Sequence, residues 1–181
     1  EKIDTLRSLY IVSYKSKTKN LQTLFSSRNL QQLIMVMGNQ KSLDGIEKSE
    51  KLQILYLYYA RSLQDISALE KVKKTLKVLC LNHCPKIEDY SVLEKMENLQ
   101  TLMIYGNHKI SDIQFISKIK SLKRFRFSVN ILDGDLSPCL KLEEATSMTN
   151  RKHYNLKDEE LPKNYDCPFG NEGIEEWMLY W

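Results

Sequence analysis

The sequence predicts an α/β solenoid: an arc of stacked repeats with a concave parallel β-sheet and a convex side of short helical or 3₁₀ turns. Three observations lead to this prediction. A nine-residue motif recurs at intervals of 20 to 24 residues, apolar residues alternate inside each copy, and apolar residues recur every third position after it. The chain has 181 residues, of which 42% are hydrophobic, so it can bury a core.

The motif is LxxLxLxx followed by Asn, Cys or Ala. Its four closest copies read LQILYLYYA from Leu52, LKVLCLNHC from Leu76, LQTLMIYGN from Leu99 and LKRFRFSVN from Leu122, and looser copies begin at Leu6, Leu30 and Leu142. This pattern resembles the leucine-rich-repeat family, and its spacing is similar to the bacterial internalin and phosphatase-regulator subclass. The resemblance covers about residues 6 to 150. It implies an array of about seven repeats, which we place at residues 1–150.

Each copy of the motif predicts one short strand. Because side chains alternate between the two faces of a strand, the fourth and sixth positions point to one face and the third, fifth and seventh to the other. The first set predicts the buried row: Leu55, Leu57, Leu79, Leu81, Leu102, Ile104, Phe125 and Phe127. The three-residue spacing that follows predicts 3₁₀ or helical turns packed through Leu63, Ile66, Leu69 and Val72; Ile87, Tyr90, Leu93 and Met96; and Ile110, Ile113, Ile116 and Ile119.

The ninth position of the motif is expected to stabilise the turn after each strand. An Asn side chain there can satisfy backbone groups that would otherwise be buried without a partner, and Asn107, Asn130 and Asn150 fit this role. Ala60 and Cys84 occupy the same position as small fillers. We interpret Cys84 as a core residue rather than a nucleophile, because buried thiols behave as small apolar groups.

Residues 151–181 leave the repeat pattern and predict a C-terminal cap or tail. They contain two prolines and two glycines, and they end in an apolar run from Trp177 to Trp181. The end of a solenoid exposes a slice of its own core, so we expect this segment to return and cover the last strand. The alternative is that the terminal apolar cluster docks on a partner.

The third, fifth and seventh strand positions form the candidate binding site. Twelve of these 21 positions are apolar or aromatic. Strands favour such residues on either face, but a contiguous apolar area usually marks an interface. We therefore expect a protein partner to bind the concave face through Tyr10, Ile34, Val36, Ile54, Tyr56, Tyr58, Val78, Met103, Tyr105, Arg124 and Arg126. The tyrosine hydroxyls are expected to be reachable, and neither Tyr56 nor Tyr105 is expected to support the core.

The last two residues of the predicted site along the chain are arginines. Arg124 and Arg126 lie two residues apart in one strand, so both leave the same face and can grip a carboxylate or a phosphate. The surrounding basic run, with Phe125 and Phe127 interleaved, raises the alternative of nucleic-acid binding. The register argues against it, because both phenylalanines occupy core positions and cannot stack on bases. No nucleic-acid partner is expected.

No catalytic residue, metal site or cofactor is expected. Cys80, His83 and Cys84 lie close in sequence, but their spacing matches no structural zinc pattern, and the two thiols should point to opposite faces. His108 and His153 have no identifiable partner for a catalytic dyad. The sequence also contains no Gly-rich phosphate loop and no nucleophile elbow, so we expect a non-enzymatic protein.

The composition of the chain bears on its cellular location and on membrane association. Charged residues make up 28% of the chain, and no apolar run approaches the roughly 18 residues of a membrane-spanning helix, so no membrane partner is expected. Residues 151–181 carry a net charge of −3 and the first 150 residues +7. Four irregularly spaced cysteines and the lack of a recognisable leader favour a cytoplasmic location. We also expect a monomer. The alternative is a secreted or cell-surface protein whose leader has been removed.

Two biological roles fit a concave-face binder. The first is an intracellular inhibitor or immunity-type binder of a protein toxin or enzyme. The alternative is a fragment of a secreted or surface adhesin or effector of the internalin type. Effectors in which such repeats precede a cysteine-dependent ubiquitin ligase are disfavoured, because only Cys167 lies outside the array and the tail is too short to build that site.

Overall fold

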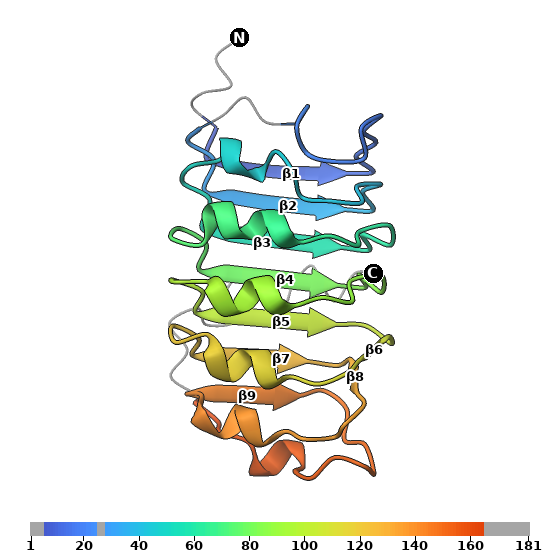
Figure 1. Ribbon diagram of the computed structural model, residues 1–181, viewed down its shortest axis with the longest axis vertical. Coiled ribbons are helices and arrows are strands. Elements are labelled where there is room, and N and C mark those ends of the chain that lie inside the picture. Colours follow the sequence, from blue (N-terminus) through green and yellow to red (C-terminus); the bar gives the residue numbers. More distant parts are fainter. Residues whose placement is uncertain (1–5, 25–27, 165–181) are drawn as a thin grey trace.

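The computed structural model describes residues 6–24 and 28–164 of the chain. Seven parallel strands stack into one sheet in the order β1, β2, β3, β4, β5, β7 and β9 (Figure 1). They span Ser8–Val12, Gln32–Val36, Ile54–Tyr58, Val78–Asn82, Thr101–Tyr105, Arg124–Phe127 and Glu144–Ser147. The predicted solenoid and its seven strands are confirmed, and every strand begins at the third position of its motif.

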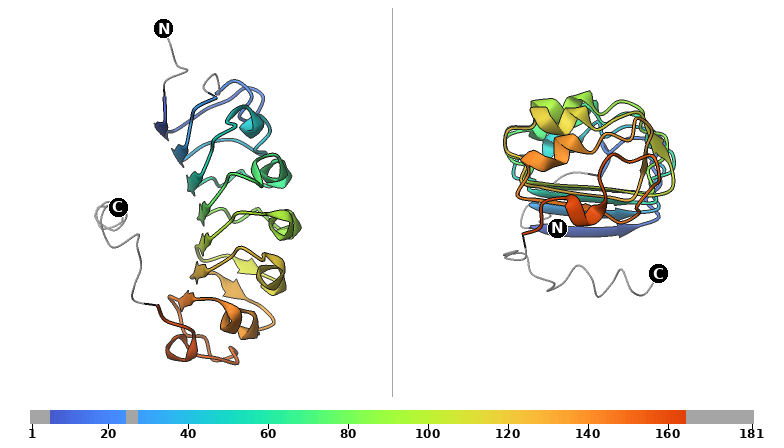
Figure 2. Two further views of the ribbon diagram at one scale, coloured as in Figure 1. Left: turned by 90° about the vertical axis from the view of Figure 1, so that its left-hand side faces the viewer. Right: turned by 90° about the horizontal axis from the view of Figure 1, so that it is seen from below.

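The strands line the inner side of an arc, and short 3₁₀ helices line its outer side (Figure 2). These helices are η2 (Ile46–Lys48), η3 (Ser67–Val72), η4 (Ser91–Lys95), η5 (Gln114–Lys118) and η6 (Ser137–Lys141), whereas η7 (Asp158–Glu160) lies beside β9 at the end of the arc. A second, two-stranded sheet joins β6 (Lys109–Ile110) to β8 (Asn130–Ile131) beside the main one. Within the described ranges, no helix has the length and apolar character needed to cross a membrane.

The strands pair in register, so equal motif positions lie side by side. Leu79 is opposite Leu55 on β3 and Leu102 on β5, for example. This pairing stacks the fourth and sixth positions into two continuous apolar columns, and all eight residues of the predicted buried row are at most 1% exposed. The columns end in Phe125 and Phe127, whose rings stack with their centroids 5.0 Å apart. The predicted register is therefore confirmed.

The outer side of the core is also confirmed. All twelve apolar residues of the three-residue spacing are buried, and most of them belong to the 3₁₀ helices or to the turns just before them. A tight turn suits this spacing, because side chains three residues apart point the same way in a 3₁₀ helix. The repeats that begin with β2, β3, β4, β5 and β7 thus each consist of one strand and one short helix around a shared slice of the core.

The eighth motif position leaves the sheet through a left-handed backbone. Ser13, Met37, Tyr59 and His83 have φ values of 57°, 57°, 53° and 54°. The backbone N–H of each donates to the last carbonyl of the next strand; that of Tyr59, for example, lies 2.8 Å from the carbonyl of Asn82. The turn therefore adds one hydrogen bond to each ladder, in a conformation that side chains rarely adopt.

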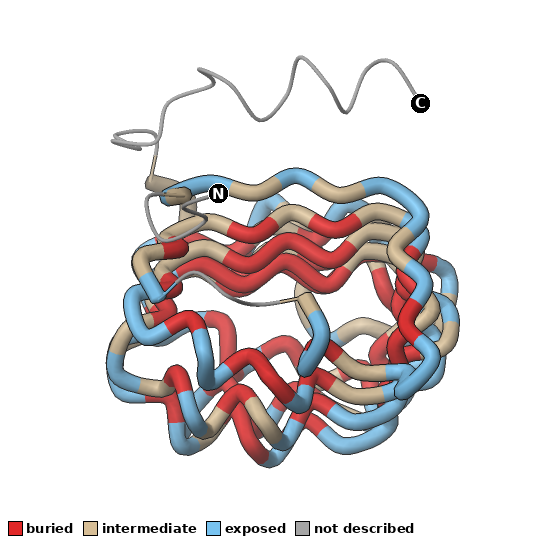
Figure 3. The backbone as a smooth tube through the Cα atoms, turned by 90° about the horizontal axis from the view of Figure 1, so that it is seen from above, coloured by how far each residue is buried: buried red, intermediate tan, exposed pale blue. Residues whose placement is uncertain are grey.

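The two ends of the arc differ. At the C-terminal end, Tyr154, Leu156 and Leu161 pack against the core, and the backbone N–H of Ala145 on β9 donates to the carbonyl of Pro162 at 2.9 Å. The part of the predicted cap at residues 165–181 lies outside the described residues. At the other end, the core-side residues of β1 are only half-buried, and Figure 3 shows this strand as the least buried of the sheet.

The predicted asparagine ladder is only partly present. The Oδ1 atom of Asn150 accepts a hydrogen bond from the backbone N–H of Asp158 at 2.9 Å and so holds the start of η7. By contrast, Oδ1 of Asn130 is buried without a hydrogen-bond partner, and Asn107 is exposed. The thiol of Cys84 takes over the turn role, because its Sγ lies 3.7 Å from the carbonyl oxygens of Leu57 and Asn82.

Candidate protein-binding surface

A second apolar cluster lies on the concave face of the sheet. We call it the concave cluster; it consists of the buried residues Tyr56, Val78, Cys80, Met103 and Tyr105, with the half-buried residues Ile34, Ile54 and Tyr58 packed against them. The sheet separates it from the main core, because its members occupy the third, fifth and seventh motif positions. The alternation of side chains along each strand therefore predicted the correct face of the sheet for these residues.

The prediction that this face is openly exposed is wrong for its centre. Tyr56 is only 5% exposed and Tyr105 only 8%, and Val78 and Met103 are buried with them. Strands in a sheet lie about 4.8 Å apart, so large side chains in register cover one another's flanks, and the inward curvature of the arc brings their outer ends closer still. The rings of Tyr56 and Tyr105 form the floor of the surface and are part of a packed layer.

The accessible part of the surface lies around this floor. Tyr10 on β1 is 46% exposed, and Ile34, Val36, Ile54 and Tyr58 are half-buried. The ring of Tyr58 packs against that of Tyr56 in a tilted arrangement, with centroids 6.1 Å apart and an angle of 33° between the planes. A partner that approaches the concave face therefore meets residues of β1, β2 and β3 first, held in place by the buried layer of β4 and β5.

Burial also sets the chemical state of the tyrosines. Desolvation, with a smaller contribution from the nearby Cys80 thiol, raises the pKa of Tyr56 to about 12. The same causes raise the pKa of Tyr58 and of Tyr105 further. The hydroxyls are therefore neutral at physiological pH, and they can act as hydrogen-bond donors or acceptors but not as bases.

The two arginines of the predicted site grip a carboxylate of the chain itself. Glu144 on β9 is buried, and its Oε1 accepts a hydrogen bond from Nε of Arg126 at 2.8 Å. Its Oε2 lies 3.5 Å from Nε of Arg124, an ion pair without hydrogen-bond geometry. Arg124 is itself buried, which leaves little of its surface accessible for the partner contact that the sequence predicts. The side chain of Arg126 stays 37% exposed at the edge of the surface while it pairs with Glu144.

Sequence reasoning missed the role of Glu144 and a row of side chains beside the sheet. The imidazole of His83 stacks on Tyr59 with centroids 4.8 Å apart, and the guanidinium of Arg61 lies 6.0 Å from the centre of the same ring. Both stacked rings occupy the left-handed eighth position. Bulky residues at a turn position were the available signal, but the motif itself does not specify that position.

The two neighbouring cysteines do not meet, because they lie on opposite faces of β4 and its turn. Cys80 belongs to the concave cluster and Cys84 to the main core. Burial raises the pKa of the Cys84 thiol to about 12 and raises that of Cys80 as well, so both remain thiols rather than reactive thiolates. His153 has a structural contact: its Nε2 lies 2.9 Å from the carbonyl oxygen of Ile131.

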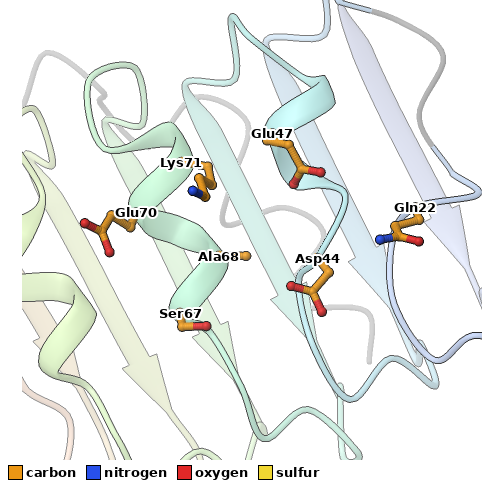
Figure 4. Close-up of a pocket in the computed structure, with 7 residues that line it drawn as sticks. All are labelled: Gln22, Asp44, Glu47, Ser67, Ala68, Glu70 and Lys71. Atoms are coloured by element: carbon orange, nitrogen blue, oxygen red, sulfur yellow. The ribbon is translucent and has the colours of Figure 1, made fainter.

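A shallow groove on the convex side lies between η2 and η3, lined by Gln22, Asp44, Glu47, Ser67, Ala68, Glu70 and Lys71 (Figure 4). Its carboxylates are already engaged. Glu47 accepts a hydrogen bond from the backbone N–H of Gly45, and Glu70 pairs with Lys95 at 2.8 Å. In the part of the chain that the structure describes, no group of three or more His, Cys, Asp or Glu residues is placed to hold a metal ion.

Comparison with known proteins identifies the repeat. Residues 74–118, about a quarter of the chain, match the family of leucine rich repeats in two copies. No curated protein matches the sequence. Among solved structures, an internalin, InlF, from Listeria monocytogenes is similar with a TM-score of 0.40 and 19% identity. The match covers 82% of this chain and 62% of that chain, so the chain spans less than two thirds of that internalin's length.

Proposed function

We propose that this leucine-rich-repeat protein is a non-enzymatic module that binds a protein partner on its concave face. Leucine-rich repeats indicate a protein-interaction module in general. The observation that carries the finer proposal is the concave cluster, a second apolar layer on the solvent side of the sheet. Contiguous apolar surface that a protein does not bury in its own core is typical of an interface.

The residues proposed to touch the partner are those that remain accessible around this layer. They are Tyr10, Ile34, Val36, Ile54, Tyr58 and Arg126. Binding energy at interfaces concentrates in a few aromatic and arginine side chains, and this set contains two tyrosines and one arginine. Tyr56, Val78, Met103 and Tyr105 hold the contacts rigid from below, which lowers the entropy lost on binding.

Within this function, we favour an intracellular inhibitor or immunity-type binder that acts as a cytoplasmic monomer. Cys80, Cys84 and Cys139 are free and buried, as is usual for proteins kept in a reducing compartment. A rigid, preformed platform also suits tight inhibition. The rival role is a fragment of an internalin-type surface adhesin or effector, and it predicts a partner outside the cell that produces the protein.

Site-specific photo-crosslinking tests the proposal. A photoreactive phenylalanine analogue is placed at Tyr58 on the concave face and, as the matched control, at the exposed residue Ser117 on η5. We expect one protein to cross-link reproducibly from position 58 and not from position 117, and mass spectrometry then identifies it. Cross-linking from position 117 alone would refute the concave site, and a partner that the producing cell does not make would favour the adhesin role.

A further inference from the structure

We propose that residues 165–181 of the chain dock on its concave face and compete there with the partner. This inference deepens the proposed function, since it names an occupant of the same surface within the same chain. Three observations support it: the end of the array is covered without this segment, the segment has the composition that the surface requires, and it can reach the surface.

The C-terminal end of the core is already covered by residues before 165. Leu161 is 3% exposed, and the hydroxyl of Tyr154 donates to the carbonyl of Val129 at 3.1 Å and accepts from the backbone N–H of Ile131 at 3.1 Å. The side chain of Lys163 donates to the carbonyl of Ala145 at 2.9 Å and pairs with Asp158 at 2.8 Å. The apolar residues from Trp177 to Trp181 are therefore not needed to cap the last strand.

The composition of the segment matches the concave face. Residues 165–181 include Phe169, Ile174 and the run from Trp177 to Trp181, which together supply a large apolar area. They also carry four carboxylates and no Lys or Arg, whereas residues 1–164 carry a net charge of +8. An acidic, aromatic segment is attracted to the basic body and can bury its rings against the concave cluster, with Arg126 at the near edge.

The segment is also long enough. The described chain ends beside β9, on the concave side of the arc (Figure 2). In the sheet order, β3 lies four strand spacings from β9, roughly 19 Å at about 4.8 Å per spacing. Seventeen residues span up to about 55 Å when extended, so the segment can cross from β9 to the accessible residues of β2 and β3.

The test uses a property of the sequence: both tryptophans of the chain, Trp177 and Trp181, lie in this segment. Tryptophan fluorescence of the intact protein therefore reports on residues 165–181 alone. We expect a blue-shifted emission and protection from acrylamide quenching, relative to a synthetic peptide of residues 165–181. Emission and quenching equal to those of the peptide would overturn the proposal.

Two sets of variants assign the protection to the concave face. The double change Val36→Glu and Tyr58→Glu places two like charges under an acidic segment, and it is expected to shift emission and quenching to the values of the peptide; Ser117→Glu on η5 is the matched control. Because the double variant alters a sheet, Leu179→Asp supplies the same test with the array intact. Unchanged protection in the double variant with a normal thermal melt, or in Leu179→Asp, would refute the assignment.

The proposal also requires that residues 165–181 dock on the concave face of their own chain and not on that of a second copy. Protection that disappears on dilution, together with a dimeric mass by light scattering, would instead place the segment on a second copy and contradict the proposal. The two proposals fail separately. If the tryptophans are fully exposed while Tyr58 still cross-links a partner, only the docking of residues 165–181 is wrong.

Discussion

Oε2 of Glu144 on β9 lies 3.5 Å from Nε of Arg124 on β7, and both side chains are less than a tenth exposed. The two residues are direct neighbours across the sheet, and Arg126 reaches the same carboxylate from the side, with its Nη2 at 2.7 Å from Oε1. One buried carboxylate thus compensates two guanidinium groups at the C-terminal end of the concave face.

Replacing Glu144 by Ala should lower the free energy of unfolding by about 3–5 kcal/mol, because it leaves the buried charge of Arg124 without a partner. Urea denaturation measures the change. The control is Glu143→Ala, which breaks the exposed pair with Lys123 at 2.9 Å and should cost no more than about 1 kcal/mol. Equal losses of stability in the two variants would show that the buried ion pair contributes no more to stability than the exposed one.

Leu102→Ala should destabilise the array by roughly 2–5 kcal/mol, since it opens a cavity in the middle of the apolar columns. Leu102 is fully buried, whereas Leu140 on η6 is 51% exposed and provides the control. A thermal melt of both variants is sufficient. If Leu102→Ala melts like the wild type, residue 102 does not contribute to the core.

Tyr56 and Tyr58 should separate stability from binding. Tyr56→Ala removes a buried ring and is expected to cost about 3 kcal/mol or more of folding stability. Tyr58→Ala removes a half-buried contact and should weaken the Kd for the partner by more than about tenfold with a smaller change in the melt. Titration calorimetry and a thermal melt of each variant give the four values. A large loss of binding confined to Tyr56→Ala would reverse the two roles.

His108 should make stability depend on pH. Burial, with a smaller contribution from His83, lowers its pKa below the ordinary 6.5, and neither ring nitrogen has a hydrogen-bond partner. The unfolded chain therefore binds the proton first, so stability is retained above pH 6.5 and falls as the pH is lowered through the pKa of the folded state. Chemical denaturation between about pH 7 and 5 should show a slope that His108→Gln reduces. Superimposable pH profiles of the two proteins would contradict this.

The sequence was sufficient to predict the strands, their register and the main core, because the alternation within a strand and the repeat length depend only on neighbouring positions. It was sufficient to assign Tyr56 and Tyr105 to the concave face, but not to predict their burial. Burial there depends on the side chains of adjacent strands and on the curvature of the arc, neither of which a single strand specifies.

Glu144 shows a second limit. Its copy of the motif, from Leu142, departs from the apolar pattern, so nothing in that stretch distinguished a buried acid from an exposed one. Only the pairing of β7 with β9 brings it beside Arg124. The expectation that both arginines face a partner considered one strand without its neighbour, and so it did not anticipate their ion pairs with Glu144.

Because the two ends of the arc differ in burial, we expect the array to unfold from one end. On β1 the core-side residues Leu9 and Ile11 are half-buried, while on β9 their counterparts Ala145 and Ser147 are buried beneath residues up to 164. Each repeat of a solenoid is held only by the repeats beside it, so local opening spreads from the weaker end. Amide protons should therefore exchange fastest at β1 and more slowly at each strand towards the middle of the arc, so the partner surface on β1, β2 and β3 begins at the end that opens most easily.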